Sequence, residues 1–195
     1  MTAAALNADP VTENQATFRA LMDAMARPGN IKELERIDAP APLAAGTAAI
    51  VRSLTDYETP VWLDDALAAE PAVAAWIRFQ TGAPIAADPR QATFALVGNA
   101  NAWPDFTTFS PGNADYPDRS TTLIVQVERF AGAAYSLTGP GIRTEQTLSA
   151  EPLPDDFAAR WAANGALFPC GIDLVLVAGT NIAAWPRTVR VMRKG

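Results

Sequence analysis

The sequence predicts an α/β fold in which a mixed β-sheet is flanked by helices. Three observations predict it. The first half of the chain has apolar residues at helical spacing, the second half has short β-branched and aliphatic runs, and helical segments interleave with these runs. Because no sequence period recurs and no low-complexity linker divides the 195 residues, we expect one domain over residues 12–195 behind an N-terminal tail, residues 1–11.

The first predicted helix begins at Thr12, which can form a capping box with Gln15. It ends before Pro28-Gly29. Within this helix four apolar residues share one face, because they are spaced at i, i+3, i+4 and i+7: Phe18, Leu21, Met22 and Met25. This stripe is typical of a helix that faces a core, and a Met-rich groove for a cofactor or partner is the alternative.

Three further elements are expected before residue 82. A helix over residues 43–54 is followed by a short strand over residues 59–63, in which Pro60 is compatible only with a strand start or an edge. Asp64-Asp65 then precede another helix, which carries the apolar residues Val73, Trp76, Ile77 and Phe79. Paired carboxylates can serve acid–base or metal chemistry, but at a helix entrance they more commonly cap the helix and complement its dipole.

The second half is predicted to supply most of the sheet. The strand candidates are residues 92–97, 121–127, 135–137, 172–177 and 189–192. A helix is expected over residues 154–164, with Pro154 in its first turn. Between the first two strands lies a long segment, residues 99–119, which contains Trp103, Phe106, Phe109 and Tyr116. Loops of this length inside a domain are commonly functional or contact surfaces.

The composition excludes several kinds of catalytic site. The chain has no His, one Cys (Cys170) and two Lys (Lys32 and Lys194), so 13 of its 15 basic residues are Arg. A Ser-His-Asp or Cys-His catalytic arrangement, a His-ligated metal, an internal disulfide and a Cys-rich zinc cluster are therefore all excluded. Neither lysine is placed like a pyridoxal phosphate lysine, because Lys32 has a carboxylate neighbour and Lys194 lies next to the terminus.

Charge and hydropathy exclude two classes of partner. The net charge is −6 and the arginines are scattered, so the sequence shows no cluster of basic residues that would bind a nucleic-acid backbone. We find no signal peptide and no run of apolar residues long enough for a membrane span. A free cysteine without an export signal favours the cytoplasm.

Two local segments could be interpreted as sites. The glycine-rich segment at residues 138–142 could hold phosphate, but it lacks the Walker lysine and Pro140 removes a backbone donor, so a tight turn is the preferred interpretation. Cys170 has no histidine to activate it, so we expect a small buried residue.

Two arginines lie at expected strand ends. Arg119 could clamp a phosphate or carboxylate, or could pair locally with Asp115 or Asp118, and the sequence leaves both open. Arg187 lies between two predicted strands, where a turn with a solvated or interface arginine is preferred over an anion site.

Taken as a series of blocks, the sequence closely resembles the PhnH family, a subunit of the bacterial carbon–phosphorus lyase machinery. The series covers nearly all of residues 12–190. Its blocks are FRALMDAM (18–25) with PG (28–29), LTD (54–56) with TPVWL (59–63), RF (78–79) with Thr81 and AP (83–84), QATFA (91–95), STTL (120–123), LTGPGI (137–142), FP (168–169), GIDL (171–174) and PRT (186–188).

The resemblance implies a fold similar to a reduced pyridoxal-phosphate (PLP) transferase domain without the cofactor, a homodimer, and docking onto companion carbon–phosphorus lyase subunits. It also implies a pathway in which a phosphonate such as methylphosphonate displaces adenine from ATP, giving a ribose 1-phosphonate 5-triphosphate. A companion subunit is credited with that chemistry.

Three roles follow as hypotheses. The first, which the poor catalytic inventory favours, is an accessory and structural subunit that is not an enzyme alone. The second is a direct contribution to a phosphate or phosphonate site at an interface, where ATP or the phosphonate would meet Arg119, Arg187 or Arg143. The third is a catalytically inactive descendant of a transferase with no link to phosphonates.

Overall fold

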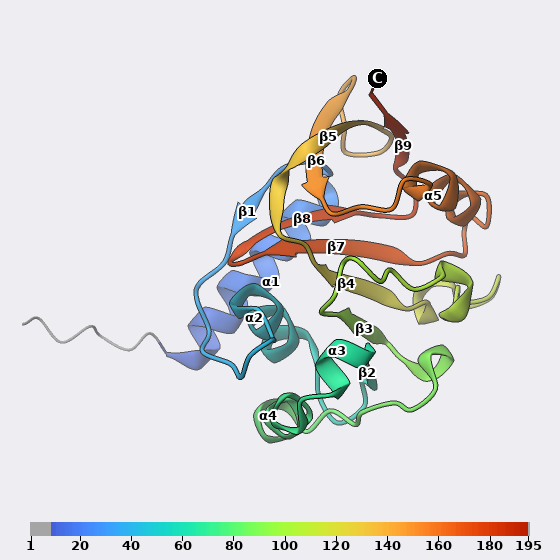
Figure 1. Cartoon of the computed structure of the whole chain (residues 1–195). Helices are drawn as coiled ribbons and strands as arrows, with labels where there is room; N and C mark the ends of the chain where they lie inside the picture. The colour runs from blue at the N-terminus through green and yellow to red at the C-terminus, as the bar shows by residue number, and fades with distance from the viewer. Residues whose placement is uncertain (1–8, 195) are drawn as a thin grey trace, which may run out of the picture.

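A six-stranded mixed sheet forms the middle of the computed structural model, which describes residues 9–194 (Figure 1). Neighbouring strands β7, β4, β3 and β2 are parallel, and β8 and β1 continue the sheet in antiparallel pairing. In order across the sheet the strands are β1 (Lys32–Glu33), β8 (Asn181–Trp185), β7 (Asp173–Ala178), β4 (Thr122–Gln126), β3 (Phe94–Val97) and β2 (Val61–Leu63).

A second, antiparallel sheet of three strands lies at the top of Figure 1, near the described C-terminal end. Its order is β6 (Gln146–Glu151), β5 (Arg129–Thr138) and β9 (Arg190–Arg193). The helices are α1 (Pro10–Ala26), α2 (Ala45–Leu54), α3 (Asp65–Ala68), α4 (Pro71–Thr81) and α5 (Phe157–Gly165), and the short 3-10 helices are η1 (Pro89–Gln91), η2 (Phe106–Thr108) and η3 (Pro117–Arg119).

Alternating side chains of the large sheet build a hydrophobic cluster on each face. On β4, Ile124 joins the cluster with α1, α2 and α4, whereas Leu123 and Val125 join the cluster with α5 and the small sheet. Both faces of the parallel strands are therefore covered, as buried parallel sheets require. The predicted α/β class with a mixed, helix-flanked sheet is confirmed, and the second sheet is an additional layer on one face.

The sequence patterns missed three strands. β8 is rich in small residues, β6 alternates polar and apolar residues, and β1 is only two residues long. Tertiary pairing rather than local propensity makes these segments strands, since β8 and β6 are each paired over several residues with a neighbour. β2 lies at the edge of the sheet, as Pro60 predicted.

The predicted start of the first helix is wrong by two residues. Asp9 is the N-cap and its side chain accepts from the Val11 N–H, so Pro10 rather than Thr12 begins α1. The expected boundary after residue 11 thus falls inside α1, and the rest of the predicted tail lies outside the described residues.

The predicted stripe on α1 does not share one environment. The core-facing residues of the helix are Thr17, Leu21 and Ala24, which contact α2 and the large sheet. Phe18 and Met22 lie beyond this arc and are 48% and 51% exposed. The expectation that these two side chains face the core is therefore wrong. The face of α1 that packs against the core carries Thr17, Leu21 and Ala24 instead.

Asp64 caps a helix, as the capping interpretation predicted. One carboxylate oxygen accepts from the Leu67 N–H at 3.0 Å, and the other accepts from the N–H groups of Gly98 at 2.9 Å and Asn99 at 3.0 Å. The carboxylate thereby joins the start of α3 to the segment after β3. The single helix expected after Asp64 is wrong, because α3 ends early and Pro71 starts α4.

Two further expectations are corrected by packing. Phe79 is 86% exposed on α4 instead of facing inward. α5 begins at Phe157, and Pro154 precedes the helix rather than entering its first turn. In the long segment 99–119, Phe106 and Phe109 are buried in the cluster below α5, so much of this loop is fixed to the core.

Candidate functional site

The structure brings two of the three candidate arginines to the same end of the strands of the large sheet. Arg119 ends η3 just before β4, and Arg187 lies in the turn between β8 and β9. Arg143 belongs to the β5–β6 connection, whose Gly141 packs closely against the backbone of Ala26 at the end of α1. Among the described residues, no hydrogen bond or ion pair joins Arg143 to the other two.

Arg187 is the centre of a buried polar network. Its side chain is 12% exposed and forms a two-point contact with Asp173, through Nε at 3.1 Å and Nη2 at 2.5 Å. Its remaining donors reach the Ser120 hydroxyl and the carbonyl oxygens of Pro117 at 2.9 Å and Pro169 at 3.3 Å. All five N–H donors have partners, so this guanidinium ties three chain segments together in place of a solvated turn residue.

Arg119 is more available than Arg187. Its guanidinium carbon lies 4.2 Å from the centre of the Tyr116 ring, a cation–π contact on the surface. Within the described residues it has no ion pair with Asp115 or Asp118, so the local-pair alternative is wrong here. Arg143 is likewise exposed, and no carboxylate in residues 9–194 pairs with it.

Two cavities flank α5. The first, of about 640 Å³, lies between η1, residues 105–111 and α5, and we name it the Arg90–Arg160 cavity after its two cationic side chains. The second, of about 630 Å³, lies between α5 and β9. Sequence reasoning missed both cavities. The two arginines of the first, Arg90 and Arg160, are 70 positions apart and carry no shared motif.

Asp105 supplies a negative charge to the Arg90–Arg160 cavity. The backbone N–H and the hydroxyl of Thr107, both 2.9 Å from its carboxylate, lower the pKa of Asp105, and Arg160 lowers it further. The carboxylate is therefore ionised at neutral pH and is suited to accept hydrogen bonds rather than to donate a proton.

The other reactive groups are held by structural contacts. Cys170 is half-buried, not fully buried as expected, and the glycine-rich segment forms a turn in which the Ile142 N–H donates to the Gly139 carbonyl at 3.1 Å. No group of three or more His, Cys, Asp or Glu side chains in residues 9–194 is arranged to hold a metal ion. Among the helices of that range, none combines the length and apolar character needed to cross a bilayer.

Comparisons with known proteins assign the chain to a family. Residues 6–192 match the family model described as bacterial phosphonate metabolism protein (PhnH). The chain is 44% identical over 189 residues, 96% of its length and 94% of the relative's, to the alpha-D-ribose 1-methylphosphonate 5-triphosphate synthase subunit PhnH of Rhizobium meliloti (strain 1021). It is 36% identical over 85 residues, 43% of its length and 44% of the relative's, to the putative C-P lyase subunit protein HtxG of Stutzerimonas stutzeri. The chain belongs to the PhnH family of bacterial phosphonate metabolism proteins.

Proposed function

We propose that this chain is an accessory, structural subunit of a carbon–phosphorus lyase assembly in phosphonate catabolism. With companion subunits it is required to form ribose 1-methylphosphonate 5-triphosphate from ATP and methylphosphonate, and it is not an enzyme alone. The name of the Rhizobium relative supports the reaction, and the name of the Stutzerimonas relative, a putative C-P lyase subunit protein, supports the assembly. We place the assembly in the cytoplasm as part of the same proposal.

The fold is proposed to be a reduced PLP-transferase fold without that cofactor. Both lysines support the absence of the cofactor, because each is paired with a carboxylate: Lys32 pairs with Asp23, and Lys194 pairs with Glu145 at 2.6 Å. The hydrogen bond from Lys194 also lowers the pKa of Glu145. A lysine that forms a Schiff base must instead be free and partly deprotonated.

The observation that supports a role through contacts rather than catalysis is a cluster of exposed apolar side chains at the end of α5. Leu167, Phe168 and Met192 are all at least half exposed, and we name them the α5 surface. Phe168 and Met192 also line the cavity between α5 and β9. Because a large solvent-exposed aromatic side chain in such a cluster marks a contact surface, we propose that the α5 surface joins two copies of the chain in a homodimer.

Replacing Phe168 with Asp is expected to dissociate this dimer. A charge placed in an apolar contact must be desolvated, and the aromatic contact is also lost, so the dissociation constant should rise by about 100-fold or more. Light scattering measures the mass. The wild type should show twice the chain mass and Phe168→Asp the chain mass alone. Phe79→Asp, which changes an exposed aromatic on α4, is the matched control, and dissociation by that variant alone would contradict the assignment.

A second candidate role is supported by the free guanidinium groups. Arg119 and Arg143 are exposed and unpaired within the described residues, so they can neutralise phosphate or phosphonate charge where this subunit meets its partners. Arg187 belongs to the same proposal only as the residue that holds η3, and hence Arg119, in position.

Add-back to the companion subunits tests both roles. The isolated chain should form no product from ATP and methylphosphonate, the companion subunits alone should form little, and adding the chain should restore synthesis. Adding Arg119→Ala or Arg143→Ala should restore assembly but lower the rate by about ten-fold if the second role also holds. Turnover by the isolated chain would refute the accessory role, and full synthesis without the chain would refute the requirement for it.

A further inference from the structure

The Arg90–Arg160 cavity combines an apolar wall with two cationic side chains. Its wall includes Phe109 from the loop, Ala163 and Leu167 from the α5 region, and Ile172 before β7. The volume of about 640 Å³ is in the range of small-molecule sites. None of Arg119, Arg143 and Arg187 lines it, so this is a site separate from the one proposed above.

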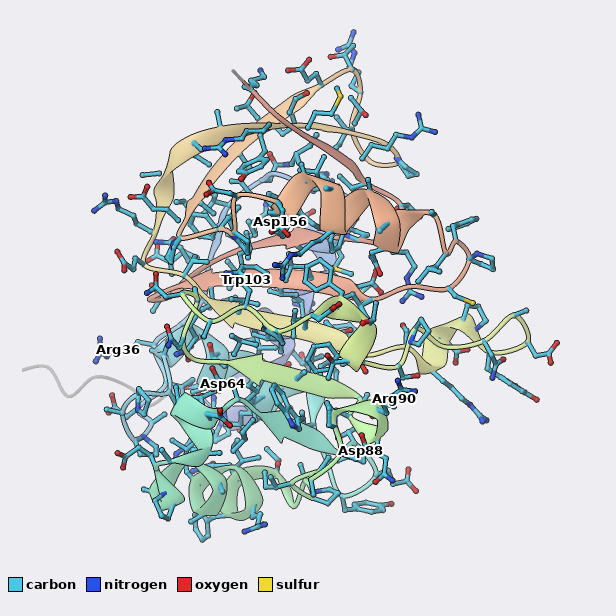
Figure 2. The ribbon with its side chains drawn as sticks, turned by 45° about the vertical axis from the view of Figure 1, so that its right-hand side comes forward. Arg36, Asp64, Asp88, Arg90, Trp103 and Asp156 are labelled. Atoms are coloured by element: carbon cyan, nitrogen blue, oxygen red, sulfur yellow. The ribbon has the colours of Figure 1, made fainter. Side chains whose placement is uncertain are left out.

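The two arginines keep donors available for a ligand. Arg90 has no side-chain hydrogen bond or ion pair within residues 9–194. Arg160 uses Nε for Asp156, at 2.9 Å, and its two terminal nitrogens have no partner there. Figure 2 shows Arg90 beside Asp88 at one end of the large sheet and Asp156 at the start of α5. Because Arg90 belongs to η1 and Arg160 to α5, the two guanidinium groups come from different walls of the cavity.

The unused guanidinium donors of the cavity favour an anion. Asp105 offsets one of the two positive charges and Asp156 pairs with Arg160, so the cationic character of the cavity rests on the free guanidinium donors of Arg90 and of the two terminal nitrogens of Arg160. Asp105 can in turn accept a hydrogen bond from a hydroxyl or amine of a ligand. Two guanidinium groups from separate elements suit a dianion better than a monoanion, because each can take its own oxygen pair.

We propose that the Arg90–Arg160 cavity binds an organic phosphate or phosphonate whose body is a flat apolar group. The phosphoryl dianion lies between Arg90 and Arg160, and the apolar body covers Phe109, Ala163 and Leu167. Inorganic phosphate or methylphosphonate would leave this wall in contact with water. The cavity therefore selects against small phosphonates. The inference does not depend on the accessory role, but Leu167 also belongs to the α5 surface, so a homodimer formed there would border this wall.

Calorimetric titration of the full chain tests the ligand class. Phenylphosphonate should bind about ten-fold more tightly than methylphosphonate or inorganic phosphate, because only phenylphosphonate covers the apolar wall. It should also bind more tightly than benzoate, which has the same ring with a single charge. Titration with AMP distinguishes an organic phosphate from a phosphonate as the ligand. Tighter binding of AMP than of phenylphosphonate assigns the site to nucleotides, and the reverse order assigns it to phosphonates.

Variants locate the site. Arg90→Ala and Arg160→Ala should each weaken phenylphosphonate binding by about ten-fold. Arg78→Ala, an exposed arginine on α4 away from the cavity, is the matched control and should bind as the wild type does. Ala163→Trp fills the cavity from an exposed helix position and should abolish binding while both arginines remain.

Circular dichroism and the molecular mass confirm that each variant is folded and has the wild-type oligomeric state. The proposal is overturned if the wild type binds neither phenylphosphonate nor AMP, if methylphosphonate binds as tightly as phenylphosphonate, or if folded Arg90→Ala and Ala163→Trp bind like the wild type.

Discussion

Replacing Arg187 with Ala should lower the free energy of unfolding by about 3–5 kcal/mol, because the change leaves a buried carboxylate without its counter-charge. Asp173 is 17% exposed and accepts both hydrogen bonds of the pair from Arg187. The same substitution removes the donors for the carbonyl oxygens of Pro117 and Pro169 and for the Ser120 hydroxyl. The acceptors of Pro117 and Ser120 are partly buried, and leaving them unpaired adds to the cost.

Urea unfolding of the Arg187 variants distinguishes the contribution of the Arg187–Asp173 ion pair from that of the other contacts of Arg187. Arg187→Lys keeps the charge but loses the planar fork, so an intermediate loss is expected. The double variant Arg187→Met with Asp173→Asn should cost less than the sum of its single changes, because each single change leaves one unpaired charge and the double variant leaves none. Arg190→Ala, an exposed arginine three positions on, should change stability by about 0.5 kcal/mol at most. A loss below about 1 kcal/mol for Arg187→Ala would show that the network is solvated.

The Arg187 network also affects how activity data on Arg119 must be interpreted. Arg187 holds the carbonyl of Pro117 and the hydroxyl of Ser120, which lie on either side of Arg119. Loss of activity in an Arg187 variant therefore follows from displacement of η3 or from unfolding, whereas Arg119→Ala removes only an exposed side chain. Of these two variants, only Arg119→Ala reports on anion binding.

The sequence patterns predicted the main framework because period and turn signals are local. The runs around β3, β4 and β7 are buried on both faces and are therefore continuous and aliphatic, so they were found. β8 was missed because its residues Asn181–Trp185 are recognised as a strand only through pairing with β7. The α1 stripe was misplaced for a similar reason, since periodicity shows that residues share a face but not which arc a neighbour covers.

The candidate site was less predictable than the fold. Arg187 was found from its place in a turn, but its five contacts come from segments up to 70 positions away. Arg90 and Arg160 gave no sequence signal at all, because only the packing of α5 over residues 105–111 brings them to one cavity. The family resemblance was confirmed, while the roles of individual arginines depend on tertiary contacts that local patterns do not encode.

Replacing Phe157 with Ala should have an effect as large as loss of Arg187, about 3–5 kcal/mol of unfolding free energy. Phe157 is fully buried at the start of α5. Its ring contacts five aromatic neighbours at centroid distances from 5.1 to 6.2 Å: Trp103, Phe106, Tyr135, Trp161 and Trp185. Removing the ring leaves a cavity that no single neighbour can fill without breaking its own contacts.

Urea unfolding measures this loss, and tryptophan fluorescence reports it locally because three of the five neighbours are Trp. Phe157→Leu keeps most of the volume and should cost about 1.5 kcal/mol or less, whereas Phe168→Ala, on an exposed Phe outside the core, should be close to neutral in the monomeric state. The cluster also keeps Tyr135 in an apolar environment, which raises the pKa of its hydroxyl.

Phe106 lies in this aromatic cluster and also lines the Arg90–Arg160 cavity. Phe157→Ala should therefore weaken phenylphosphonate binding even in buffer without urea, where the variant is folded. Unchanged binding with lowered stability would mean that the loop holds the cavity without support from the core.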